Sequence, residues 1–126
     1  MLVFTYGTLR RGQRYHAWLE GATCKGRHVT APRYTMLVLE GYPGVVEGGR
    51  TAIVGELYEV SAAALARLDR LEEAPSLYLR RLVPTPRGSA WMYLYRGRAR
   101  GRRRLPSGDW CRFAPSLVRS SQIENS

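Results

Sequence analysis

The sequence is poor in the residues from which disulfides, metal sites and membrane spans are built. Its two cysteines, Cys24 and Cys111, stand far apart without metal-ligand spacing and are expected to be free thiols. The two histidines, His16 and His28, are likewise single. No apolar run approaches the roughly 20 residues that cross a bilayer, and the apolar start at residues 1–6 is expected to be a strand rather than a signal peptide. We therefore expect a cytosolic protein that does not associate with membranes.

Lysine is almost absent, since Lys25 is the only one beside 19 arginines in a chain of formal net charge +10. Such a skew is more typical of a base-composition bias than of phosphate binding. Six arginines fall within Arg96–Arg104, and a run of like charge is usually a solvated loop. The run still supports an alternative hypothesis, a non-enzymatic binding module that contacts nucleic acid or an acidic partner through this loop. Nucleic-acid binding is disfavoured, because the run lacks the interleaved aromatic residues of known RNA-binding modules.

The length of 126 residues predicts one domain, which we place at residues 1–118, followed by a flexible C-terminal tail at residues 119–126. Short β-branched and aromatic runs between glycines and prolines predict about six strands around one main helix. This pattern favours an α+β domain whose sheet curls toward a barrel with a pocket at its mouth. The expected strands are residues 2–6, 26–31, 34–39, 51–60, 78–83 and 90–95.

A helix is predicted directly after Ser61, which can cap the first free amides. At about 100° per residue, Glu72 falls about 20° from Leu65 and about 40° from Leu68, on the face that should be buried. Burial would raise the pKa of Glu72 and let it exchange protons near neutral pH. The alternative is that the helix ends here and Glu72 turns out to solvent.

A second candidate segment follows the first strand. Gly7 is expected to adopt a positive φ, so that the amides of Thr8 and Leu9 form a small concave site for a carboxylate or an oxyanion. The alternative is an ordinary tight turn.

Three segments occur in a recognisable order: YGTLRRGQ at residues 6–13, VGELY at residues 54–58, and LDRLEEAPSLYLR at residues 68–80. Together they resemble the γ-glutamylcyclotransferase-like family, which includes γ-glutamylamine cyclotransferases and proteins of the AIG2 type. The resemblance runs from Met1 to about Tyr95, and residues 107–110 look like the family's closing segment. It implies a small closed mixed β-barrel with flanking helices and an enzyme that uses no metal and no organic cofactor.

The resemblance also implies a reaction. A γ-glutamyl amide, a small molecule, is cleaved by its own α-amine to give 5-oxoproline and a free amine or amino acid. By the motif match, Glu72 corresponds to the catalytic glutamate, which would remove the proton of the attacking amine and return it to the leaving nitrogen. The loop that holds the glutamyl group corresponds to Tyr6, Gly7, Thr8 and Leu9.

Three further residues follow the helix. Tyr78 matches a residue that lines the site in the family, although an aromatic core role fits its spacing equally well. Arg80, two residues later on the same strand face, is a weaker candidate for binding a carboxylate, and Tyr95 is weaker again.

The chain departs from the family pattern in two places. Residues 14–16 read Arg-Tyr-His where many members have Asn-His, and Glu73 replaces a small residue. Both changes affect the leaving-group side of the expected pocket, where an extra carboxylate would favour amines and raise the pKa of Glu72.

Overall fold

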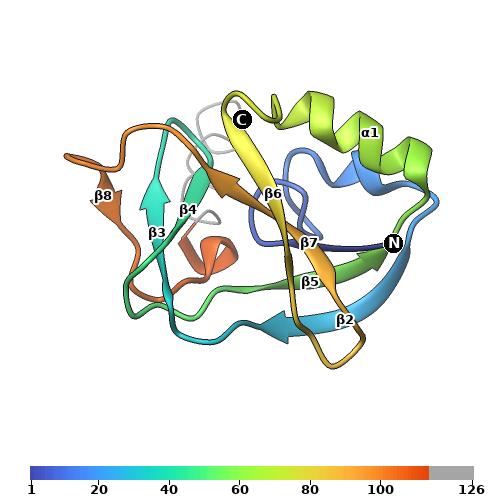
Figure 1. Cartoon of the computed structure of the whole chain (residues 1–126), viewed down its shortest axis with the longest axis horizontal. Coiled ribbons are helices and arrows are strands. Elements are labelled where there is room, and N and C mark those ends of the chain that lie inside the picture. The colour runs from blue at the N-terminus through green and yellow to red at the C-terminus, as the bar shows by residue number, and fades with distance from the viewer. Residues whose placement is uncertain (114–126) are drawn as a thin grey trace, which may run out of the picture.

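The computed structural model describes residues 1–113, which form two sheets and one long helix stacked in layers (Figure 1). The expected tail at residues 119–126, like the expected domain end at residue 118, lies outside the described residues. The elements in chain order are β1 (Leu2–Thr5), the 3-10 helix η1 (His16–Leu19), β2 (Thr23–Val29), β3 (Tyr34–Val38), β4 (Pro43–Glu47), β5 (Val54–Glu59), α1 (Ala62–Leu71), β6 (Tyr78–Val83), β7 (Ala90–Tyr95) and β8 (Arg103–Arg104).

The larger sheet has five strands in the order β2-β5-β1-β7-β6. The first strand of the chain lies at its centre, antiparallel to β5 and parallel to β7. Consequently the end of β1 is surrounded by protein on both sides, and the loop that follows it starts deep in the molecule. The smaller sheet has the order β4-β3-β8.

The α+β class is confirmed, but the expected closure of the sheet is wrong. The strands divide into two sheets, and within residues 1–113 the outer edges of β2 and β6 carry no further strand. Closure requires a continuous hydrogen-bonded ladder. Instead, β4 approaches β7 through side-chain packing: a Cβ placed on Gly44 would lie 2.9 Å from Cγ of Tyr95.

Two apolar clusters hold the layers together. One joins the large sheet to α1 and contains Val3, Leu65 and Leu68. The other joins the two sheets and contains Phe4 and Trp110, which are both 1% exposed. Because the central strands β1, β5 and β7 are largely buried on both faces, a cavity between them and the end of α1 has rigid walls on several sides.

Helix α1 forms where the sequence predicts it. Ser61 caps it, since the amide of Ala64 donates to Ser61 Oγ at 3.1 Å. The helix ends at Leu71, and the amide of Glu72 still donates to the carbonyl of Leu68 at 2.9 Å. Glu72 therefore keeps a helical position one turn after Leu68.

The arginine run is not entirely a loop. Its last two residues form β8, which pairs antiparallel with β3. A helical turn then begins at residue 110. Across residues 1–113, every helix is too short or too polar to cross a bilayer.

Candidate active site

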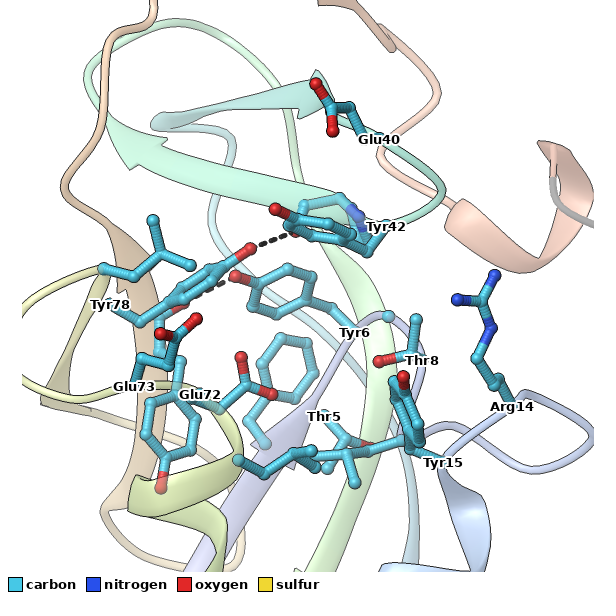
Figure 2. A pocket seen from close by; sticks show the side chains of 17 residues that line it. Thr5, Tyr6, Thr8, Arg14, Tyr15, Glu40, Tyr42, Glu72, Glu73 and Tyr78 are labelled. Carbon is cyan, nitrogen blue, oxygen red and sulfur yellow. Dashed lines mark hydrogen bonds between the residues drawn. The ribbon is translucent and has the colours of Figure 1, made fainter.

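A cavity of about 280 Å³ opens where the ends of β1 and α1 meet the loop between β3 and β4 (Figure 2). Its volume is close to the lower end of the roughly 300–1,000 Å³ typical of small-molecule sites. The structure brings six of the eight expected site residues to its walls: Tyr6, Gly7, Thr8, Leu9, Glu72 and Tyr78.

Glu72 points into this cavity (Figure 2). Both sequence alternatives describe part of the result, because the helix does end before Glu72, yet the side chain turns inward. The residue as a whole has intermediate exposure, while burial of its carboxyl raises its pKa from the ordinary 4.5 to about 7. Such a group can both accept and donate a proton at neutral pH.

No donor within residues 1–113 forms a hydrogen bond to the Glu72 carboxylate. No fully buried side-chain oxygen or nitrogen in that part of the chain lacks a partner. The unpartnered oxygens of Glu72 must therefore keep access to the cavity. A ligand that enters the cavity can reach them.

The loop after β1 supplies free main-chain donors, although not for the expected reason. Gly7 does not have a positive φ; it is required because a Cβ there would lie 2.6 Å from Cγ of Pro43. Within the described residues, the amides of Thr8 and Leu9 donate to no protein acceptor, and both residues line the cavity. Free amides of this kind can bind a carboxylate or a developing oxyanion.

Arg10 holds this loop in place, a role that no local pattern in the sequence indicates. Its side chain is 9% exposed and forms 2.8 Å ion pairs with Glu56 on β5 and with Asp109. The same Glu56 accepts a hydrogen bond from the amide of Arg11 at 2.9 Å. These partners are 46 and 99 residues away from Arg10 in the sequence, so only the folded chain brings them together.

Three tyrosine hydroxyls near the cavity are all engaged in hydrogen bonds. Tyr6 donates to the carbonyl of Tyr93 at 2.6 Å, and Tyr78 donates to the carbonyl of Pro43 at 2.8 Å (Figure 2). The hydroxyl of Tyr93 donates to Asp69 at 2.6 Å. Burial raises the pKa of each of these tyrosines, so all three are neutral donors at physiological pH.

The two weaker sequence candidates lie outside the cavity lining. Arg80 is held elsewhere, because its Nε donates to Asp69 at 2.7 Å and its guanidinium lies 4.4 Å from the ring centre of Trp91. Tyr95 packs behind the wall, with its ring centre 5.6 Å from that of Tyr78. Neither side chain is in a position to touch a ligand directly.

The mouth of the cavity carries charges that the sequence only partly indicated. Arg14 and Glu73, which belong to the two departures from the family pattern, both line it. Glu40 and Tyr42, from the loop between β3 and β4, were missed because nothing local distinguishes them from ordinary turn residues. Thr5 and Tyr15 (Figure 2), together with Tyr93, complete the polar lining.

Two other features bear on function. Residues 1–113 contain no group of three or more His, Cys, Asp or Glu side chains arranged to hold a metal ion. In the arginine segment, Arg96 donates to the carbonyl of Pro75 at 2.6 Å and Arg103 lies 5.1 Å from the ring centre of Phe113. The segment is therefore anchored near both ends, while all six of its arginines stay exposed.

Comparison with known proteins gives a consistent assignment. Residues 3–112 match the family profile described as "Gamma-glutamyl cyclotransferase, AIG2-like". A relative in Vibrio cholerae, named a putative gamma-glutamylcyclotransferase, is 44% identical over 110 residues, which cover 87% of this chain and 95% of that protein.

Two more distant comparisons extend this result. The gamma-L-glutamyl-butirosin B gamma-glutamyl cyclotransferase of Niallia circulans is 38% identical over 71 residues, which cover 56% of this chain and 45% of that protein. A crystal structure of a protein from Pyrococcus horikoshii superposes with a TM-score of 0.80 at 28% identity, covering 94% of this chain and 97% of that one. The chain that forms this cavity, with its inward-facing glutamate, therefore belongs to the γ-glutamyl cyclotransferase, AIG2-like family and is a cyclotransferase.

Proposed function

We propose that the protein releases 5-oxoproline and a free amine or amino acid from a γ-glutamyl amide, by attack of the substrate's own α-amine. The observation that carries the proposal is that an unpartnered carboxyl of raised pKa, Glu72, and two residues with free main-chain amides, Thr8 and Leu9, lie on the walls of one small cavity. The name of the Niallia relative supports the substrate class, because it refers to a γ-glutamyl derivative of butirosin B.

The α-amine of a free γ-glutamyl compound is an ammonium at pH 7 and cannot attack until it has lost a proton. Glu72, with a pKa of about 7, is matched to this task. In the proposed step Glu72 takes one proton from the ammonium, the neutral α-nitrogen bonds to the δ-carbon of the amide, and the second proton that this nitrogen then loses passes to water. Glu72 then gives the proton to the leaving nitrogen as its bond to the δ-carbon breaks.

The free amides of Thr8 and Leu9 have two candidate partners, the substrate's α-carboxylate and the oxyanion that develops on the δ-carbonyl. Tyr6 and Tyr78 would form the apolar side of the pocket around the glutamyl chain, because their hydroxyls already donate to main-chain carbonyls. The nucleophile and the electrophile belong to one molecule, and effective molarities for such reactions reach about 10⁵–10⁸ M. The proposed reaction thus needs neither a metal nor an organic cofactor.

The test is a panel of γ-glutamyl amides incubated with the protein, with 5-oxoproline and the released amine quantified by mass spectrometry. We expect the two products in equal amounts from at least one substrate. The matched control is the same substrate with its α-amine acetylated, from which we expect no turnover. Release of the amine from the acetylated substrate would mean that water is the nucleophile and would refute the proposed reaction.

A further inference from the structure

Most acidic side chains of this basic chain are paired, and the unpaired ones collect at the cavity. Residues 1–113 contain nine Asp and Glu residues. Five of them form ion pairs: Glu47, Glu56, Glu59, Asp69 and Asp109. Of the four described carboxylates that form none, three line the cavity: Glu40, Glu72 and Glu73. A chain with 20 lysines and arginines thus leaves the free negative charge of its described residues almost entirely at one site.

Glu73 occupies a backbone position that usually belongs to glycine. The amide of Ala74 donates to the carbonyl of Asp69 at 2.8 Å. The amide of Glu73 donates to the carbonyl of Arg70 at 3.2 Å, and together these two bonds form the Schellman pattern that ends many helices. The pattern needs a left-handed residue after the helix, and Glu73 supplies it with a φ of 52°. Glycine is usual there because it has no Cβ to crowd the backbone.

The side chain of Glu73 does not compensate for this strain through contacts within the protein. It is exposed, and within residues 1–113 every hydrogen bond or ion pair to a carboxylate goes to another residue. It does not adjust Glu72 either, because burial is what raises the pKa of Glu72. Both glutamates reach the cavity from the end of α1 (Figure 2). Strained residues cluster at ligand-binding sites, so the partner of Glu73 is expected in a ligand.

Glu40, in the loop between β3 and β4, adds negative charge to the same part of the mouth. Burial raises the pKa of Tyr42, and Glu40 and Glu73 both raise it further, so both carboxylates act on this one hydroxyl. Arg102 has the opposite effect on Tyr42. Arg14, the one cation that lines the cavity within residues 1–113, lies on the far side from Glu73 (Figure 2). The side of the mouth that adjoins the end of α1 is therefore acidic.

The proposed reaction places the leaving group on this acidic side. Glu72 returns a proton to the leaving nitrogen, so that nitrogen must come within hydrogen-bond reach of Glu72. Because the glutamyl part fills the interior of the cavity, the chain attached to this nitrogen extends toward the mouth, where Glu73 follows Glu72. Glu73 would attract an ammonium on that chain and repel a carboxylate.

We propose that the leaving group is a di- or polyamine, an amine with a second positive charge, and that Glu73 selects it, with Glu40 strengthening the attraction. This inference rests on the proposed function, because it depends on where the leaving nitrogen lies. It names the substrate class, the γ-glutamyl monoamides of di- and polyamines. It also gives a purpose to a carboxylate that the fold does not need.

The experiment compares three γ-glutamyl amides whose leaving chains have the same length and differ at the far end. They are the amides of 1,4-diaminobutane, pentylamine and 5-aminopentanoic acid, which end in an ammonium, a methyl group and a carboxylate. We expect kcat/KM for 5-oxoproline release to fall in this order, by about 2–5-fold at each step, the range of an exposed charge pair. In Glu73→Gln the three values should move together. In Glu20→Gln the wild-type order should remain, because Glu20 is the fourth unpaired carboxylate and lies outside the cavity lining.

Three results would overturn the proposal. Equal values for the three amides in the wild type would mean that the mouth does not discriminate charge. A preference for the carboxylate amide would assign the selection to Arg14. The wild-type order retained in Glu73→Gln would mean that another group makes the selection.

A second variant tests whether Glu73 is kept for its charge. Glu73→Gly relieves the left-handed conformation, so it should unfold at a higher urea concentration than the wild type while it loses the preference for the diamine amide. A variant less stable than the wild type would show that the side chain serves the fold, and would count against the proposal.

Binding separates this inference from the proposed function. If none of the amides is turned over, their dissociation constants are compared by calorimetry. Tighter binding of the diamine amide that is lost in Glu73→Gln would support the charge selection while refuting the ring-forming reaction. Equal dissociation constants, or no binding of any amide, would overturn the charge selection as well.

Discussion

Replacing Glu72 by glutamine should raise the free energy of unfolding at neutral and alkaline pH, but not at acidic pH. The carboxyl has a pKa of about 7 in the folded protein and an ordinary pKa of 4.5. Between these values the folded state binds more protons than the unfolded state, so the free energy of unfolding of the wild type falls as the pH rises. The stability that the protonated Glu72 carboxyl contributes is fully present below pH 4.5 and lost above pH 7.

The magnitude follows from the same two pKa values. A difference of about 2.5 units, at about 1.36 kcal/mol per unit, gives about 3.4 kcal/mol. Because Glu72 retains intermediate exposure, solvent screening makes this an upper value, and we expect about 2–3 kcal/mol. Glu72→Gln cannot ionise, so it should gain this amount over the wild type at pH 8 and gain little from this source at pH 4.5.

The assay is urea denaturation of the wild type and Glu72→Gln at several pH values from 4.5 to 8. Titration of the other side chains cancels in the difference between the two proteins. The matched control is Glu73→Gln, which changes the exposed neighbour and should track the wild type. Parallel stability curves for the wild type and Glu72→Gln across this pH range would refute the reasoning, because the carboxyl would then not be desolvated.

Three further predictions follow from the site. Because the pKa of Glu72 is about 7, kcat/KM for 5-oxoproline release should rise with pH and level off above about pH 7; a midpoint of 4–5 would contradict the assigned base. Gly7→Ala places a methyl group 2.6 Å from Cγ of Pro43, so it should lower stability by about 1–3 kcal/mol in urea denaturation and reduce kcat/KM; wild-type behaviour in both assays would count against the tight loop. Arg10→Met leaves the partly buried carboxylates of Glu56 and Asp109 without their cation, so it should cost about 3–5 kcal/mol; a loss below about 1 kcal/mol would show that the ion pairs do not hold the loop.

Features that depend on local sequence could be predicted well. The strands at residues 78–83 and 90–95 are confirmed at the expected bounds, since each is a short run of β-branched, aromatic and other apolar residues. The Ser61 cap and the buried positions Leu65 and Leu68 are also confirmed, because helical periodicity and capping act within a few residues.

Features that depend on distant parts of the chain could not be predicted. The sheet order places β1 between β5 and β7, an arrangement that no local pattern in the sequence indicates. The last two residues of the arginine run become a strand only because β3 offers a free edge. Gly7 was expected to allow a positive φ, which is wrong. It is needed because Pro43 lies close to it, and Pro43 belongs to a strand 36 residues later in the chain.

In the candidate site too, some residues could be predicted from local sequence and others could not. Periodicity placed Glu72 on the correct side of α1, and the family resemblance pointed to the loop at residues 6–9. The ion pairs of Arg10 and the hydrogen bond from Tyr93 to Asp69 join residues that are far apart in the sequence. Their residue types are common, so no pattern in the sequence distinguishes them.

The central claim is that Glu72 moves the proton during ring closure, and the most direct measurement is the rate of 5-oxoproline formation by Glu72→Gln. Glutamine keeps the shape of the side chain but cannot exchange a proton, so we expect a loss of kcat of about 10²-fold or more. Glu20→Gln, which alters an exposed carboxylate outside the cavity lining, should retain kcat within a few-fold. A Glu72→Gln protein that forms 5-oxoproline at the wild-type rate would contradict the account.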